Sequence, residues 1–115
     1  MSDCIFCKIA TGAIPSEKIV DNDSFFVIKD IRPKAPVHLL IIPHQHITSL
    51  LAIEPAHGPL LAEMLLALKN LAKQYELDGF RTLINSGQSS GQEVFHLHFH
   101  LLANTNTSQQ KLPGF

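Results

Sequence analysis

Three histidines near the end of the chain alternate with apolar residues, in the segment His96-Leu97-His98-Phe99-His100-Leu101-Leu102. On a β-strand successive side chains point to opposite faces, so this segment would bury its apolar residues and line its other face with three imidazoles. Three ligands along a row of roughly 13 Å cannot easily converge on one metal, but two neighbours about 7 Å apart can share a phosphoryl group. Because imidazole has a pKa near 6.5, it can act near neutral pH as a nucleophile, a general acid or a cationic phosphate ligand.

A fourth histidine, His38, interrupts the otherwise apolar segment Val37–Pro43, which is predicted to form a buried strand. The alternative interpretation of all four is that they are partly buried or solvated side chains without a chemical role. Three imidazoles on one strand face, opposite a fourth, favour chemistry over that alternative.

A second motif, Cys4-x-x-Cys7, opens the chain. In a reducing compartment such a pair is more typical of a metal site or a redox motif than of a structural disulfide. Zinc prefers four sulfur and nitrogen ligands, so two spare histidines would complete a closed site. Cysteines without a metal are the alternative, and a thioredoxin-like role is disfavoured because the pair does not follow a strand.

The composition limits the classes of function. A chain of 115 residues with 45% hydrophobic and 17% charged residues has room for one globular domain and is not disordered. The formal net charge of −1 argues against a general nucleic-acid partner, which requires a basic surface. No apolar run reaches the roughly 18 residues of a membrane span, and the first residues lack a signal-peptide core. We therefore expect no membrane partner and a cytoplasmic location.

The elements that position these residues follow from apolar periodicity and turn residues. The pattern predicts a short helix over 5–9, strands over 18–21, 24–29, 37–43, 80–85 and 94–103, and one amphipathic helix over 55–76. This order predicts an α+β fold, a mainly antiparallel sheet with one long helix and a short N-terminal helix.

The histidine row fits the His-φ-His-φ-His-φ-φ motif (φ is apolar) of the histidine triad (HIT) family, and the chain resembles this family beyond the motif. The other matching segments are Ile5-Phe6-Cys7-Lys8-Ile9, Ile14-Pro15, Asp30-Ile31, Ala35-Pro36-Val37-His38, Ile42-Pro43 and Gly91-Gln92-Glu93-Val94-Phe95. The resemblance implies one HIT domain over 1–115, with a core over 4–102 and a polar tail over 104–115. Within the family the chain is similar to the Hint-like branch of purine nucleoside phosphoramidases, which are typically homodimers whose sheets join.

The resemblance implies a hydrolase that cleaves a purine nucleoside monophosphate, AMP or GMP, from a phosphoramidate or acyl leaving group. His98 would be the nucleophile that forms an adenylyl-histidine, and His100 would bind the phosphate oxygens. His38 would support the hydrogen-bond network, and His96 would orient the nucleophile through its backbone carbonyl. No cofactor is expected for catalysis.

The nucleotide-binding residues are carried over in the same way. Asp30 would accept hydrogen bonds from the ribose hydroxyls, and an apolar slot for the base would be formed by Ile5, Phe6, Ile9, Ile14, Ile28 and Ile31. Asn85 and the turn Gly91-Gln92-Glu93 would lie along the phosphate and the leaving group. Glu93 stands where many relatives have Ser or Thr.

A structural zinc is the remaining implication of the resemblance. In relatives with the cysteine pair, the ligands correspond to Cys4, Cys7, His46 and His96. This assignment would divide the triad, because His96 would be structural while His98 and His100 would be catalytic.

Three other functions remain open. A dinucleoside polyphosphate hydrolase is one, although Asn85 favours the Hint-like branch because those hydrolases carry Gln at this position. A nucleotide-binding regulatory module without turnover is the second. The third is a metallohydrolase that uses the histidine row as ligands.

Overall fold

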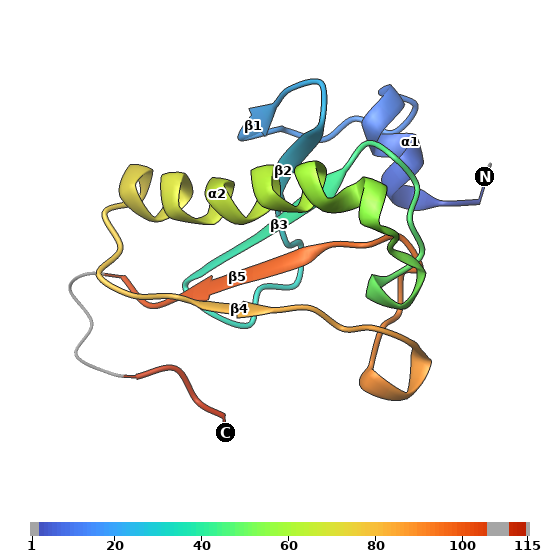
Figure 1. The fold of residues 1–115 in the computed structure, drawn as a ribbon. Coiled ribbons are helices and arrows are strands. Elements are labelled where there is room, and N and C mark those ends of the chain that lie inside the picture. The colour runs from blue at the N-terminus through green and yellow to red at the C-terminus, as the bar shows by residue number, and fades with distance from the viewer. Residues whose placement is uncertain (1–2, 106–110, 115) are drawn as a thin grey trace.

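The computed structural model describes residues 3–105 and 111–114, which form a five-stranded sheet with a helix on each side (Figure 1). The strand order is β1-β2-β3-β5-β4, and every neighbouring pair is antiparallel. The elements are α1 (Ile5–Thr11), β1 (Val20–Asp21), β2 (Phe25–Lys29), β3 (Val37–Pro43), α2 (Gly58–Gln74), β4 (Arg81–Leu83) and β5 (Phe99–Ala103). The expected α+β fold is confirmed. Of the polar tail expected over 104–115, residues 106–110 and 115 lie outside the described part.

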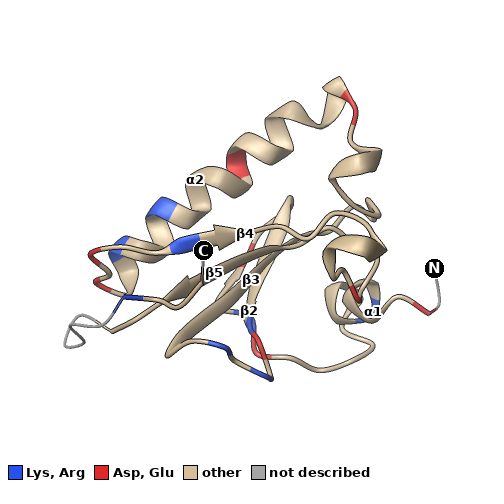
Figure 2. Ribbon diagram, turned by 90° about the horizontal axis from the view of Figure 1, so that it is seen from below, with Lys and Arg blue, Asp and Glu red and all other residues tan. Residues whose placement is uncertain are grey.

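The two faces of the sheet carry different clusters because side chains alternate along each strand. One face packs against α2, which Figure 2 shows lying along one side of the sheet, and its buried members include Phe25, Val27, Leu39, Ile41, Met64, Leu68, Leu71, Phe99 and Leu101. The other face packs against α1 through Phe6, Ile9, Phe26, Ile28, Leu40 and Ile42. His38 and His100 share the alternation of Leu40 and therefore belong to the α1 face.

Strand β5 begins later than expected. The sequence predicted a strand over 94–103, but the ladder with β3 ends at the pair Ile41↔Phe99. Continued in the same register, Ile42 would lie opposite His98 and Pro43 opposite Leu97, and Pro43 has no N–H to donate. The Leu97 N–H donates instead to the Ile47 carbonyl at 2.6 Å. His96 and His98 therefore precede the strand, and their alternation is not imposed by sheet pairing.

Helix α2 also begins later than the predicted residue 55. Pro55–His57 form a 3₁₀ turn, closed by a capping box in which Glu54 and His57 each accept a hydrogen bond from the other's backbone N–H. The helix buries Met64 and Leu68, but Leu65, which the periodicity placed on the apolar face, is 54% exposed.

Helix α1 presents the cysteine pair to the core. Cys4 is its N-cap residue, and the Cys4 Sγ accepts the N–H of Cys7 at 3.3 Å. Gly12, with φ of 86°, ends the helix in the left-handed conformation that glycine adopts without strain. The fold thus brings Cys4 and Cys7 against the segment that leads into β5.

Candidate active site and metal centre

The nucleophile candidate, His98, has one ring nitrogen fixed by the backbone. Its Nδ1 lies 2.7 Å from the carbonyl oxygen of His96. A carbonyl only accepts hydrogen bonds, so Nδ1 carries the proton and Nε2 keeps a free lone pair. The side chain is buried, and its ring lies 5.0 Å from the ring of His100. His98 therefore presents an unprotonated nitrogen beside a second imidazole.

The proton of His100 is located by a chain of two hydrogen bonds. The backbone N–H of Lys34 donates to His38 Nδ1 at 3.0 Å, so neutral His38 carries its proton on Nε2. That nitrogen lies 2.9 Å from His100 Nδ1 and donates to it. His100 must then carry its own proton on Nε2. Among the described residues, this Nε2 is the buried side-chain nitrogen or oxygen that has no partner.

Asp30 lies beside this network. One carboxylate oxygen is 3.4 Å from His38 Nε2, and the other accepts the Arg32 N–H at 2.8 Å. The ligand atoms of Asp30, His38 and His100 lie within 4.8 Å of one another, a spacing that could suit a metal. However, the Lys34 N–H occupies His38 Nδ1 and forces the proton onto Nε2, the nitrogen a metal would need. We therefore interpret this group as a hydrogen-bond network.

Burial keeps these imidazoles neutral. Burial, together with the nearby His98 and His38, lowers the pKa of His100 to about 4. Burial also lowers the pKa of His98 and of His38, and for His38 the Asp30 carboxylate opposes the shift. At pH 7 the site thus holds one imidazole lone pair and one imidazole N–H donor, and neither is lost to protonation.

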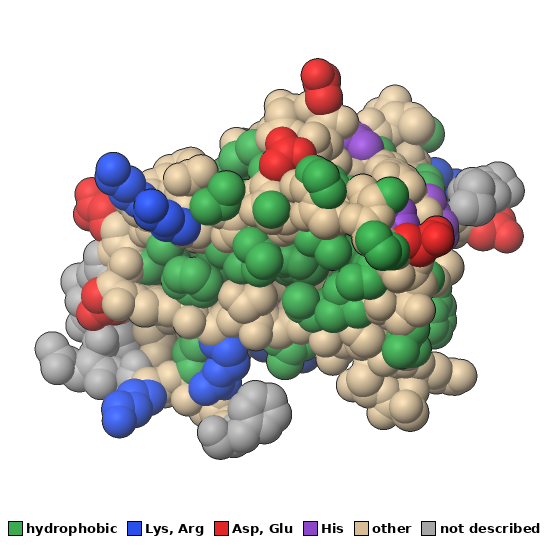
Figure 3. All heavy atoms as spheres, viewed as in Figure 1, with side chains coloured by type: hydrophobic (Ala, Val, Ile, Leu, Met, Phe, Trp, Pro, Cys, Tyr) green, Lys and Arg blue, Asp and Glu red, His purple; other side chains and the backbone are tan. Residues whose placement is uncertain are grey.

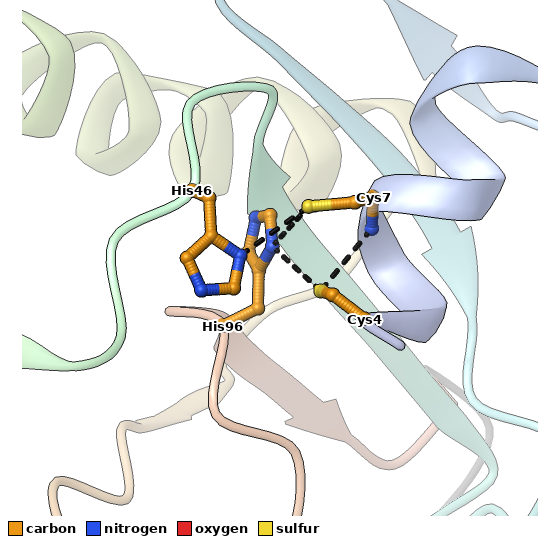
Figure 4. A group of neighbouring side chains, drawn as sticks. All are labelled: Cys4, Cys7, His46 and His96. Atoms are coloured by element: carbon orange, nitrogen blue, oxygen red, sulfur yellow. Dashed lines mark hydrogen bonds between the residues drawn. The ribbon is translucent and has the colours of Figure 1, made fainter. Parts of the chain in front are cut away.

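A separate cluster joins the cysteine pair to two histidines, as Figure 4 shows. The Cys4 Sγ lies 3.2 Å from His96 Nδ1, and the Cys7 Sγ lies 3.3 Å from His46 Nδ1 and 3.6 Å from His96 Nδ1. All four donor atoms lie within 4.8 Å of one another. The structure thus brings together the complete set expected from the sequence.

The donor set fits a zinc ion. His96 Nε2 lies 2.8 Å from the Pro43 carbonyl and donates to it, so the Nδ1 lone pair faces the two sulfurs. Two sulfurs and two imidazole nitrogens are a usual tetrahedral zinc set. Burial and the neighbouring Cys4 raise the pKa of the Cys7 thiol, and a bound cation would stabilise its thiolate.

The six residues expected to form the base slot do not all meet. Phe6, Ile9 and Ile28 are buried in one cluster, with Ile14 packed against it. The ring of Phe6 stands edge-on to His98 with centroids 5.1 Å apart. Ile5 is 44% exposed and Ile31 is 91% exposed, so both lie at the surface outside this cluster.

The turn expected along the phosphate is fixed by Gln92. Its buried amide accepts the Gly87 N–H at 2.8 Å and donates to the carbonyls of Thr48 at 2.7 Å and Val94 at 3.0 Å. The side chain thus holds three segments together, and its contact with a nucleotide stays a prediction. The other expected members, Asn85, Gly91 and Glu93, lie in the same region, with Asn85 partly buried just past β4 and the other two exposed.

Sequence reasoning missed two backbone groups that decide the site. The Lys34 N–H sets the tautomer of His38, and the Pro43 carbonyl sets that of His96. No residue pattern signals a backbone donor, because its direction depends on the loop conformation.

Comparisons with known proteins identify relatives of this chain. A family model described as "Scavenger mRNA decapping enzyme C-term binding" matches residues 3–112. "Protein HitA" of Neisseria gonorrhoeae is 50% identical over 103 residues, which cover 89% of this chain and 96% of that protein. A HIT family hydrolase from Legionella pneumophila Philadelphia 1 superposes with a TM-score of 0.87 at 39% identity, covering 93% of this chain and 97% of that chain. A zinc-bound histidine triad family protein from Mycobacterium smegmatis has a TM-score of 0.81 at 32% identity, covering 97% and 81%.

Proposed function

The chain belongs to the histidine triad (HIT) family, and we propose that it hydrolyses the bond between a purine nucleoside monophosphate and its leaving group. One observation carries the proposal: two neighbouring imidazoles present nitrogens of opposite character. His98 offers a lone pair at Nε2, and His100 offers a buried N–H at Nε2 that lacks a partner within the described residues. A nucleophile beside a hydrogen-bond donor is what displacement at phosphorus requires.

In the first step, the His98 Nε2 lone pair attacks the α-phosphorus. The bond from phosphorus to the leaving nitrogen or oxygen breaks, and the leaving group departs with its electron pair, a leaving amine taking up a proton from the solvent. The His100 N–H donates to a non-bridging phosphate oxygen, where negative charge develops. The His96 carbonyl, 2.7 Å from Nδ1, stabilises the positive charge that His98 acquires.

In the second step, water attacks the phosphorus of the nucleotidyl-histidine and loses a proton to the solvent. The bond from phosphorus to His98 Nε2 breaks, and the nucleoside monophosphate is released. Two easier displacements thus replace one difficult one. Both steps need neutral rings at the start, which burial provides by lowering the pKa of His98 and His100.

Substrate binding is proposed for the residues around this pair. The base would lie against the apolar cluster of Phe6, Ile9, Ile14 and Ile28, with the exposed Ile5 and Ile31 closing over it. Asp30 would accept hydrogen bonds from the ribose hydroxyls, since one of its carboxylate oxygens lies 3.4 Å from His38 Nε2, beside the proposed phosphate site. Asn85, Gly91, Gln92 and Glu93 would line the path of the phosphate and the leaving group.

We propose a structural zinc held by Cys4, Cys7, His46 and His96, and catalysis without a metal. A bound zinc would neutralise the two thiolates and fasten α1 to the segments before and after the central strands. The relative from Mycobacterium smegmatis, described as zinc-bound, supports this assignment. In the reducing cytoplasm, where we propose that the chain acts, the thiols stay available for the metal.

We also propose a homodimer. Leu65 and Leu66 on α2 are 54% and 61% exposed, and Figure 3 shows hydrophobic side chains gathered along this helix. Strand β4 lies at the edge of the sheet. A second copy that pairs at β4 would extend the sheet and cover these leucines. Light scattering measures the mass directly, and a monomer at micromolar concentration would contradict the dimer.

The test of the proposed activity is AMP release from an adenosine 5′-phosphoramidate. We expect release that persists in excess chelator for as long as circular dichroism shows a folded chain. Release that stops on chelation while the chain stays folded would assign the chemistry to a metal. A folded, zinc-loaded chain that binds AMP but releases none would be a nucleotide-binding module instead.

A further inference from the structure

The cysteine pair has a second kind of chemistry available to it. Cys4 and Cys7 are the two cysteines of the chain, and both are free and partly exposed. We propose that they form a redox site: a peroxide converts them into an intrachain disulfide, which removes the zinc ligands and loosens α1 from the nucleotide site. The effect on nucleotide binding rests on the proposed function, whereas the disulfide and the release of the metal do not.

The geometry allows the disulfide to close locally. The two sulfurs lie within 4.8 Å of each other, in the first turn of α1. Cys4 is the N-cap and its Sγ already accepts the Cys7 N–H at 3.3 Å, so both side chains point to the same side of the helix end. Residues three apart on a helix have Cβ atoms about 5–6 Å apart, against about 4 Å in a disulfide, so small side-chain and backbone adjustments suffice.

A surface pocket gives access to Cys4. The pocket, of about 490 Å³, is lined by Cys4 and His46 together with Asp3, Ile5, Thr48, Glu93, Val94 and Phe95. Cys4 faces this pocket and Cys7 does not line it. The carboxylates of Asp3 and Glu93 would repel anionic disulfides, but they do not hinder hydrogen peroxide, which is small and neutral. The pocket therefore favours peroxide as the oxidant and Cys4 as the sulfur that is oxidised first.

The reaction balances without a further reagent. The Cys4 thiolate attacks one peroxide oxygen, the O–O bond breaks, hydroxide leaves and Cys4 becomes a sulfenic acid. The Cys7 thiolate then attacks the Cys4 sulfur and expels a second hydroxide. The two sulfurs lose two electrons in total, and the peroxide gains them. A disulfide is no longer a pair of thiolate ligands, and His46 and His96 alone are too few to hold zinc.

The consequence reaches the nucleotide site through α1. Four donor atoms connect this helix to His46, which follows β3, and to His96, which precedes β5. The helix carries two residues of the proposed base slot, Phe6 and Ile9. The centroid of the Phe6 ring lies 5.1 Å from that of the His98 ring. After oxidation the helix loses these four donor contacts and keeps the apolar packing of Phe6 and Ile9. The His98 ring is held by the backbone carbonyl of His96, and loss of zinc from the His96 ring does not remove that carbonyl. We therefore expect kcat to change less than KM.

The test uses the full chain loaded with one equivalent of zinc and treated with hydrogen peroxide. We expect one zinc released per chain, a mass lower by two hydrogen atoms, and a Cys4–Cys7 peptide link. AMP affinity should fall at least about fivefold, the lower end of typical coupling between sites. Amide exchange in α1 should accelerate. Dithiothreitol with zinc should reverse all of these changes.

A Cys7→Ser variant is the matched control, because its Cys4 sulfenic acid has no resolving thiol and should form no intrachain link. The measurements on the wild-type chain decide the matter even if this variant folds poorly. A chain that binds no zinc, forms only sulfinic acid or links between chains, or keeps its zinc after the disulfide forms would overturn the proposal. Unchanged α1 exchange in the oxidised chain would also overturn it. If the chain neither binds nor hydrolyses nucleotides, the proposed function fails, while zinc release and α1 exchange still decide the redox site.

Discussion

His96 and His98 are two positions apart, yet each ring donates to a backbone carbonyl through a different nitrogen. His96 donates through Nε2, and His98 donates through Nδ1. The Pro43 carbonyl accepts from His96 Nε2, which leaves Nδ1 facing the cysteine sulfurs. The His96 carbonyl accepts from His98 Nδ1, which leaves Nε2 free for phosphorus. The same side chain thus becomes a metal ligand or a nucleophile according to which nitrogen the backbone holds.

The two clusters also differ in how the chain builds them. The metal cluster joins three segments that are far apart in sequence, around residues 4–7, 46 and 96. The catalytic network joins adjacent strands in register, with His38 on β3 and His100 on β5. A metal can hold separate loops together, whereas the spacing of His38 and His100 relies on the hydrogen bonds between β3 and β5. His96 serves both clusters, through its ring in one and its carbonyl in the other.

The largest effect is expected from His98→Ala. The variant loses the bond-forming atom but little of the nucleotide pocket, so kcat should fall by at least about 10³-fold with AMP affinity within about tenfold. Steady-state kinetics and calorimetry measure the two quantities. His44→Ala, at a histidine outside both clusters, is the control. Turnover of His98→Ala close to that of the wild-type chain, in a clean preparation, would show that His98 is not the nucleophile.

The next effect is expected from His38→Phe, which keeps a buried ring but removes the donor to His100. His100 then loses the partner that fixes its proton on Nε2, and kcat should fall by about 10²-fold. Lys34→Ala is the matched control because it keeps the backbone N–H that His38 Nδ1 accepts, and it should stay within about threefold of wild type. Nitrogen-15 shifts of the His100 ring would report the tautomer. An unchanged tautomer in His38→Phe would contradict the network.

The sequence could predict the strands and their alternation but not these partners. Leu97, Phe99 and Leu101 are buried as the period of two requires, and Val37–Pro43 is the strand that the apolar run indicates. The late start of β5 depends on Pro43 lying opposite Leu97, and that register is a property of the folded sheet. The Lys34 N–H and the Pro43 carbonyl belong to the backbone, so no side-chain pattern identifies them.

A smaller effect on turnover is expected from His96→Ala, which separates the two uses of this residue. The ring is fully buried and faces both sulfurs, so the variant should lose high-affinity zinc and about 2–4 kcal/mol of stability. The carbonyl remains, so kcat should fall by no more than about tenfold at a temperature where the chain is folded. Zinc titration, chemical denaturation and kinetics measure the three quantities. A loss of kcat as large as that of His98→Ala would show that the two clusters are not separable.

The smallest effect is expected from mild acid. If the His98 ring alone had the ordinary pKa of 6.5, lowering the pH from 7.5 to 6.0 would reduce kcat/KM about fourfold, because only about a quarter of such rings stay neutral at pH 6.0. Burial lowers the pKa of His98, and it lowers that of His100 to about 4. The change over this range should therefore be smaller than fourfold. A fourfold fall in a chain that stays folded would contradict the buried, neutral pair.

The same shifts fix the sign of the pH dependence of stability. Unfolding returns each histidine to a pKa near 6.5, so below that pH the unfolded chain binds more protons than the folded one. The contribution of His100 to stability is thus complete above pH 6.5 and is lost as the pH falls towards about 4. Denaturation midpoints measured from pH 7.5 to 4.5 should decline in step with this window. His100→Gln, which carries no titratable ring, should show a shallower decline, and an equal slope in both chains would place the proton uptake elsewhere.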